Sequence, residues 1–186
     1  MNKKKYCELF HKLRKNISIP ALSSETGVKK AEIELLFDHI ENILNSSEQK
    51  ANKVIIYTDG AARGNPGPAG LGVIVEDETG NTVAELSEFL GKVTNNVAEY
   101  RALERGLEKA LNLGASSVLI KTDSELLTKQ IEGFYRVRNK TLIPLHQKCK
   151  ELLTEFTEHA IVHIPRALNK RADVLANNAI DKASRG

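Results

Sequence analysis

The 186-residue sequence has no tryptophan, only two cysteines and no long apolar run. Cys7 and Cys149 stand far apart and form no Cys-x-x-Cys or Cys/His pattern, which argues against a zinc site or a disulfide framework. Two reduced thiols are typical of a cytoplasmic protein. No apolar run approaches the roughly 20 residues that cross a bilayer, so we expect no membrane contact. The basic N-terminus also lacks the apolar core of a secretory signal.

Acidic and basic residues nearly balance, with 27 Lys and Arg against 24 Asp and Glu, so the net charge is +3. This small excess permits a polyanionic partner without requiring one. If the chain binds nucleic acid, the positive charge must therefore be local. The length predicts one full domain with an appendage.

The appendage is predicted to be a helical extension and linker over residues 1–52. Two sets of apolar residues recur at helical spacing, and a polar stretch follows over 45–52. We expect Pro20 to lie beyond the end of the first helix, and Ser23 and Ser24 to cap a turn before the second. Such short helices bury little surface alone, so the unit should pack on something. The two sets are Tyr6, Leu9, Phe10, Leu13 and Ile17, and Ile33, Leu36, Phe37, Ile40 and Leu44.

Residues 53–186 are predicted to form an α/β domain. Apolar and β-branched runs predict strands, and amphipathic stretches predict helices. The first three strands form an antiparallel meander, and the last two should be parallel to the first, which gives a five-stranded mixed sheet flanked by helices. The expected strands are 54–58, 71–75, 82–89, 118–122 and 160–164, and the expected helices are 96–113, 124–132, 142–157 and 170–183.

Two carboxylates are expected side by side at one edge of this sheet. Asp59 and Asp123 each end a predicted strand, and neighbouring parallel strands deliver their carboxyl ends to the same edge. Glu99 and Asp173 are further candidates on predicted helices. Like charges this close need a counter-charge, and all-oxygen ligands favour Mg²⁺ or Mn²⁺.

Each of these acidic residues also has a purely structural interpretation. Asp59 could be a turn residue and Asp123 a helix N-cap, while Glu99 could balance a helix dipole. Asp173 could simply face solvent. The Gly- and Pro-rich loop 61–68 is neither a P-loop nor a Rossmann turn, because no GKS, GKT or helix follows its glycines.

Four segments, in the order that the family has them, resemble motifs of the type 1 ribonuclease H family. Four motifs in register are specific, and together they cover Val54 to about Ala183. The segments are Thr58–Gly70, Thr94–Glu99, Thr122–Ser124, and a C-terminal signature of His163–Arg166, Asn169 and Ala172–Ala176.

This resemblance implies a ribonuclease H fold and endonucleolytic hydrolysis of the RNA strand of an RNA–DNA hybrid, leaving 5′-phosphate and 3′-hydroxyl ends. It implies two Mg²⁺ ions, with Mn²⁺ as a substitute. Asp59 would bridge both ions, Glu99 and Asp123 would hold the second, and Asp173 the first. His163 takes the place of a family histidine that serves proton transfer or product release, although a histidine at a strand end could also be a packed core residue. Arg166 is a second candidate for that role.

Substrate contacts are implied at eight positions that match the family motifs. Reading the 2′-hydroxyl distinguishes RNA from DNA, and polar groups beside the carboxylates suit that task. For the two asparagines of the Thr94–Glu99 segment, helix capping is the alternative. The eight are Gly60, Arg63, Gly64, Asn65, Asn95, Asn96, Ser124 and Asn169.

The sequence departs from the family in three places. Glu125 follows the Thr122–Ser124 motif where some relatives have Gln. The basic, tryptophan-rich handle of some relatives is absent, although Arg136, Arg138 and Lys140 leave a small positive patch. The first 52 residues match no hybrid-binding domain. Residues 23–28 faintly suggest a helix-turn-helix, and the basic start could contact nucleic acid or a protein, or be a solvated face.

Two other functions fit the same pattern. A related nuclease that cuts DNA would share the fold, and so would a non-catalytic nucleic-acid-binding or adaptor protein. The presence of all four carboxylates argues against the adaptor, and the Thr-Asn-Asn and Gly-Asn-Pro-Gly segments argue against the DNA nuclease.

Overall fold

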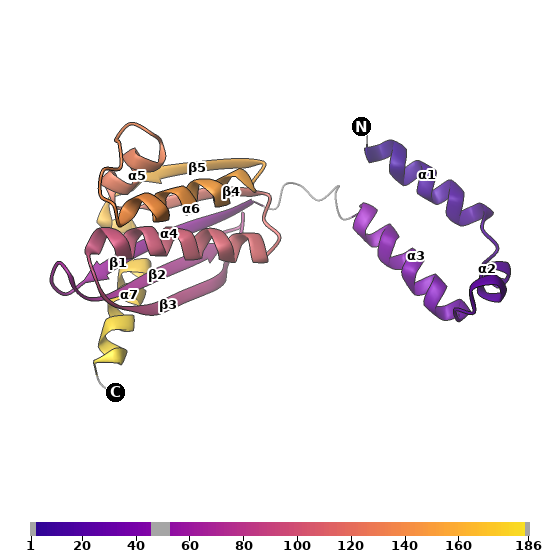
Figure 1. Cartoon of the computed structure of the whole chain (residues 1–186), viewed down its shortest axis with the longest axis horizontal. Coiled ribbons are helices and arrows are strands. Elements are labelled where there is room, and N and C mark those ends of the chain that lie inside the picture. Colours follow the sequence, from indigo (N-terminus) through magenta and orange to yellow (C-terminus); the bar gives the residue numbers. More distant parts are fainter. Residues whose placement is uncertain (1–2, 46–52, 185–186) are drawn as a thin grey trace. The chain divides into compact units, whose positions relative to one another are not determined.

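The computed structural model describes residues 3–45 and 53–184, which belong to two compact units, 1–50 and 51–186 (Figure 1). Each unit has its own packing and is described by itself. None of the helices in the described ranges combines the length and apolar character that a bilayer span requires.

The N-terminal unit is a hairpin of α1 (Lys3–Asn16) and α3 (Lys30–Asn45), joined by the short α2 (Ile19–Thr26) (Figure 1). The rings of Phe10 and Phe37 pack with their centroids 5.8 Å apart. Arg14 forms ion pairs with Asp38, at 2.5 Å, and with Glu41. This aromatic contact and these ion pairs join the two long helices within the described residues.

Pro20 lies beyond the end of the first helix as predicted, because α1 ends at Asn16, but the sequence prediction missed α2, and Ser23 and Ser24 lie within it rather than capping a turn before the next helix. Pro20 lies in the first turn of α2, where its missing N–H removes no helical hydrogen bond. Ser18 is the N-cap, and its Oγ accepts from the Ala21 N–H at 3.4 Å. Gly27, with φ of 73°, ends the helix in the left-handed region.

The second unit contains the expected five-stranded mixed sheet, in the order β3-β2-β1-β4-β5. The β1–β2 and β2–β3 pairs are antiparallel, and the β1–β4 and β4–β5 pairs are parallel. The prediction of three antiparallel strands followed by two parallel ones is confirmed. The strands are β1 (Lys53–Ala62), β2 (Gly67–Glu76), β3 (Thr82–Val93), β4 (Ser117–Thr122) and β5 (Glu158–His163).

Helices cover both faces of this sheet (Figure 1). A Cβ on Gly106 of α4 would lie 3.3 Å from Val73, whereas a Cβ on the adjacent Gly72 would lie 2.0 Å from the Ala172 carbonyl of α7. Because successive strand residues face opposite sides, α4 and α7 lie on opposite faces. The helices of this unit are α4 (Asn95–Asn112), α5 (Glu125–Ile131), α6 (Leu142–Thr154) and α7 (Lys170–Ala183), with the short 3₁₀ helix η2 (Arg166–Leu168) before α7.

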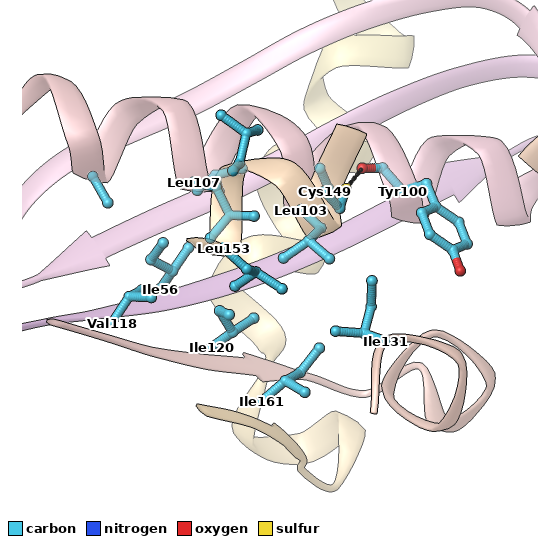
Figure 2. Close-up of a cluster of buried hydrophobic side chains, with 14 of the residues drawn as sticks. Ile56, Tyr100, Leu103, Leu107, Val118, Ile120, Ile131, Cys149, Leu153 and Ile161 are labelled. Carbon is cyan, nitrogen blue, oxygen red and sulfur yellow. Dashed lines mark hydrogen bonds between the residues drawn. The ribbon is translucent and has the colours of Figure 1, made fainter. Parts of the chain in front are cut away.

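The core lies between the sheet and the α4 and α6 layer (Figure 2). Ile56 and Ile120 from the central strands meet Leu103 of α4 and Leu153 of α6, all fully buried. Burying large aliphatic side chains contributes about 1.5–3 kcal/mol each. This packing fixes α4, and with it Glu99, relative to β1.

Some element ends differ from the prediction. β1 runs on to Ala62 and β2 begins at Gly67, within the predicted loop 61–68, because Ala61 and Ala62 pair with Gly70 and Ala69 across a hairpin. Glycine and proline content predicted a longer loop, but strand pairing shortened it. The helix predicted over 142–157 ends at Thr154.

Candidate active site

Strand register places the first two carboxylates next to each other. The parallel pairing of β1 with β4 ends at Thr58 and Thr122, so Asp59 and Asp123 are the next residues on neighbouring strands. Asp59 lies within β1 rather than at its end, because β1 continues in its pairing with β2. It is not a turn residue.

Glu99 reaches the same place because α4 crosses β1 closely at Gly60. A Cβ on Gly60 would lie 2.2 Å from the Glu99 backbone nitrogen, a distance that no side chain allows. Glu99 is 7% exposed, and its Oε2 has no hydrogen-bond partner among the described residues. An unpaired buried carboxylate oxygen is costly and indicates a missing cation or donor.

Asp173 enters from the opposite face of the sheet, in the first turn of α7. The absence of a side chain at Gly72 lets α7 lie directly against β2. The Asp173 Oδ1 accepts a hydrogen bond of 2.6 Å from Arg166, whose side chain is otherwise largely exposed. Asp173 is thus half-buried and paired, not a free surface residue.

All four carboxylates line one cavity of about 410 Å³. As the side chains stand, no three acidic, histidine or cysteine residues within the described ranges are drawn together tightly enough to hold a single ion. Arg166 and Asn169 each bond one of the carboxylates instead. The cavity is lined by Asp59, Gly60, Ala61, Ala62, Asn95, Glu99, Asp123, Arg166, Asp173 and Asn177.

The electrostatics of the cavity disfavour negative charge without a cation. Burial, followed by the charges of Asp123 and Asp173, raises the pKa of Asp59 to about 7. Burial, with Asp59 and Asp123 nearby, raises the pKa of Glu99 well above its ordinary value. A divalent cation is the counter-charge that would keep these groups ionised near neutral pH.

Asn169, predicted as a substrate contact, lies in a position that favours a structural role. The side chain belongs to a residue that is 1% exposed. Its Nδ2 donates to the Thr58 carbonyl at 2.9 Å and to Asp123 Oδ1 at 2.7 Å. Asn169 therefore ties the start of α7 to β1 and orients Asp123.

The helix caps settle two of the structural alternatives. Ser124, not Asp123, is the N-cap of α5, and its Oγ accepts from the Leu127 N–H at 3.4 Å. Thr94 is the N-cap of α4, so neither asparagine that follows it serves as the cap. The Ser124 hydroxyl predicted to bind substrate is therefore already engaged as a helix cap.

The other predicted substrate residues lie at the rim. The Asn95 N–H donates to Asn65 Oδ1 at 3.2 Å, which joins the β1–β2 loop to the start of α4. Asn96 is exposed beside it. Gly64 is exposed in the same loop with φ of 99°, and Arg63 forms an ion pair with Asp181 of α7.

His163 is exposed at the last position of β5, in register with Thr122. It is therefore not a packed core residue, and it does not line the cavity.

Sequence reasoning missed Asn177, Ala61 and Ala62, which also line the cavity. Asn177 lies one helical turn after Asp173, and its Nδ2 donates to the Asp173 carbonyl at 2.9 Å. Its spacing of four residues from Asp173 was the available signal. Ala62 carries no chemical signal, and only the continuation of β1 places it there.

Comparison with known proteins gives a consistent picture. A family model described as reverse transcriptase-like matches residues 57–179. The chain is 42% identical over 134 residues to ribonuclease HI of Halobacterium salinarum. The aligned region covers 72% of this chain and 67% of that protein. It is 43% identical to a bifunctional protein of Mycobacterium tuberculosis, but spans only 36% of that protein's length.

Solved structures show the same relationship. RNase H1 from Halobacterium salinarum superposes with a TM-score of 0.69 at 43% identity, covering 70% of this chain and 98% of that one. LC11-RNase H1, isolated from compost and solved in complex with an RNA/DNA hybrid, gives a TM-score of 0.67 at 49% identity, with coverage of 70% and 98%. Fold, motif order and identity over the second unit agree, and the chain belongs to the type 1 ribonuclease H family.

Proposed function

We propose that this protein hydrolyses the RNA strand of RNA–DNA hybrids endonucleolytically, leaving 5′-phosphate and 3′-hydroxyl ends. The observation that carries the proposal is the cavity into which β1, β4, α4 and α7 bring Asp59, Asp123, Glu99 and Asp173. The relative solved with a hybrid, at 49% identity, supports the choice of substrate.

The residues present fit divalent metal ions, which the proposed reaction requires. The donor set is all oxygen, and Glu99 Oε2 has no hydrogen-bond partner within the described part of the chain. Burial, and then the neighbouring carboxylates, raise the pKa of Asp59 and of Glu99. Such a set suits Mg²⁺, with Mn²⁺ as a substitute. Asp59, Glu99, Asp123 and Asp173 would hold two ions, and bound ions would supply an activated water and stabilise the charge on the phosphate.

Two neighbouring polar residues, Asn169 and Arg166, hold two of these carboxylates in position. Asn169 holds one oxygen of Asp123 in place, and the unpaired oxygen of Glu99 points to a site for positive charge. Arg166 neutralises Asp173 while no cation does so. Its exposed guanidinium is then free to meet a phosphate once Asp173 is engaged elsewhere.

The polar residues around the edge of the cavity are the ones proposed to recognise the RNA strand. The Asn65 and Asn95 pair places two amide side chains and the β1–β2 loop beside the carboxylates. Amide groups both donate to and accept from a 2′-hydroxyl, which DNA lacks. Asn96 and the backbone of Gly64 extend this polar rim. His163, exposed at the same sheet edge, is the candidate for proton transfer or product release.

The decisive variant is Asp59→Asn, which keeps the shape of the side chain and removes its charge. We expect cleavage of a labelled hybrid with Mg²⁺ to fall by at least about 100-fold, because losing a metal ligand should cost more than losing a residue that only orients one. Glu158→Gln, at the exposed start of β5, is the matched control and should cleave normally.

Parallel assays separate the other functions. Undiminished cleavage by folded Asp59→Asn protein would refute the carboxylate assignment. Preferred cleavage of duplex DNA would favour a DNA nuclease, and hybrid binding without cleavage at millimolar Mg²⁺ or Mn²⁺ would favour a non-catalytic binder.

A further inference from the structure

The part of the N-terminal hairpin whose side chains the structure describes has almost no core of its own. Among residues 9–41, whose side chains the structure describes, Ile33 alone is buried. Six large apolar residues there are 36–67% exposed, and so small a unit gains too little stability from its own packing. They are Leu9, Leu13, Ile17, Val28, Leu35 and Leu36.

Exposed leucines and ion pairs lie on different sides of the hairpin. α1 and α3 run antiparallel (Figure 1), and Arg14 and His11 bond α3 along one edge of their contact. At 100° per residue, Leu9 and Leu13 lie on the other edge of α1, and Leu36 lies on the corresponding edge of α3. One face is therefore apolar, and we call it the leucine face.

The two long helices carry opposite charge. α1 has six Lys and Arg and one Glu, whereas α3 has four Asp and Glu and one Lys. Lys12 is exposed three residues after Leu9, and Glu32 is exposed four residues before Leu36. The leucine face is thus bordered by a basic helix on one side and an acidic helix on the other.

We propose that the leucine face pairs with the leucine face of a second copy of this chain, with α1 of each copy against α3 of the other. A two-fold interface repeats every contact, so this arrangement brings basic and acidic helices together twice. Packing α1 on its own copy would oppose like charges. The hairpin is therefore complementary to itself in its apolar face and in the charge of its helices.

Nucleic acid is a poorer occupant of this face. A leucine surface offers no donors to phosphate, the acidic α3 repels it, and Arg14 is already paired with Asp38 and Glu41. Association through the hairpin would join two catalytic units, but it does not depend on the function proposed for them.

Sedimentation velocity of the full chain tests the proposal. We expect a dimer at micromolar concentration, and Leu13→Glu or Leu36→Glu should raise its dissociation constant at least tenfold while the helical circular dichroism stays unchanged. Val83→Glu is the control, because Val83 is 45% exposed on β3 of the second unit. A monomeric wild-type chain, or a dimer that both leucine variants keep, would overturn the proposal.

Charge reversal tests the orientation of the two copies. In a chain with Lys12→Glu both borders of the leucine face carry an acidic residue, and in a chain with Glu32→Lys both borders carry a basic one. Each alone should dimerise less tightly than the wild type, and an equimolar mixture should recover the dimer. Failure of the mixture to recover it would contradict the α1-on-α3 arrangement and point to a different occupant, such as the catalytic unit or another protein.

Discussion

Burial and two neighbouring carboxylates raise the pKa of Asp59 from its ordinary 3.8 to about 7. Because the pKa in the folded protein lies above that in the unfolded chain, the contribution of this group to stability is complete below about pH 4 and is lost as the pH rises through 7. The contribution of Asp59 should therefore make the metal-free protein less stable at pH 8 than at pH 5. The raised pKa of Glu99 lowers stability with rising pH in the same way.

We expect Asp59→Asn to stabilise the metal-free protein at pH 8 and to have little effect at or below about pH 4. A pKa change from 3.8 to about 7 corresponds to on the order of 4 kcal/mol, which is an upper limit for the gain. Thermal unfolding in chelator at both pH values measures it. An equal gain in stability at the two pH values would show that the charge of the Asp59 carboxylate does not destabilise the folded protein. Mg²⁺ affinity of the wild type should fall below pH 7, because protons compete for the same oxygens.

Asn169 acts at the same scale through Asp123. Asn169→Ala removes the donor that orients the carboxylate, so we expect cleavage to fall about 10–100-fold and the Mg²⁺ concentration for half-maximal rate to rise. The KM for hybrid should stay the same, because the side chain is buried. A raised KM with an unchanged metal requirement would instead support the substrate-binding role that the motif implied.

At the scale of elements, the site depends on how closely helices approach strands. Gly60 permits the contact of α4 with β1, and Gly72 permits that of α7 with β2. Both contacts involve backbone atoms, which cannot rotate away as a flexible side chain can. The distance between a helix and the sheet therefore decides where Glu99 and Asp173 lie.

Gly60→Ala should consequently displace α4, lower the free energy of unfolding by about 1–3 kcal/mol and reduce cleavage sharply. Gly80→Ala is a suitable control, because its Cβ would meet nothing within 4 Å and only its φ of 85° adds strain, about 1 kcal/mol. Denaturant unfolding and hybrid cleavage report the two effects. If both variants kept full activity, the close approach would have no part in placing Glu99.

For the whole molecule, the small net charge of +3 means that hybrid affinity must come from local patches. The loop between α5 and α6 holds exposed Arg136, Arg138 and Lys140 where some relatives carry a handle. Contacts to phosphate release counterions, so such binding weakens steeply with salt.

Replacing these three residues by Ala should weaken hybrid binding and reduce the slope of log affinity against log salt by up to about 3, at roughly 0.9 per phosphate contact. Arg105→Gln removes a charge that Glu88 and Glu108 already hold, so it should leave the slope unchanged. Fluorescence anisotropy with Ca²⁺ in place of Mg²⁺ measures binding. An unaltered slope in the triple variant would place the phosphate contacts elsewhere.

Local pattern was enough to predict most of the second unit. The periodicity of apolar residues predicted its strands and helices, because that periodicity shows which side chains are buried. The order of these elements then predicted the mixed sheet. The short helix α2 was missed because Pro20 was taken only as the residue beyond the first helix, whereas proline also begins helices and the Ser18 cap marks the start of this one. The loop after Asp59 was predicted too long because strand pairing extends across it.

The sequence by itself determined the four carboxylates, the motifs that contain them and the sheet edge where two of them meet. Tertiary structure alone decided that Asn169 orients Asp123, and that α4 and α7 bring Glu99 and Asp173 to the same cavity. The physical reason is that residue type and spacing carry information about local hydrogen bonds and burial. Contacts between side chains far apart in sequence depend on differences of about an ångström in the distance between a helix and the sheet, which no local pattern specifies.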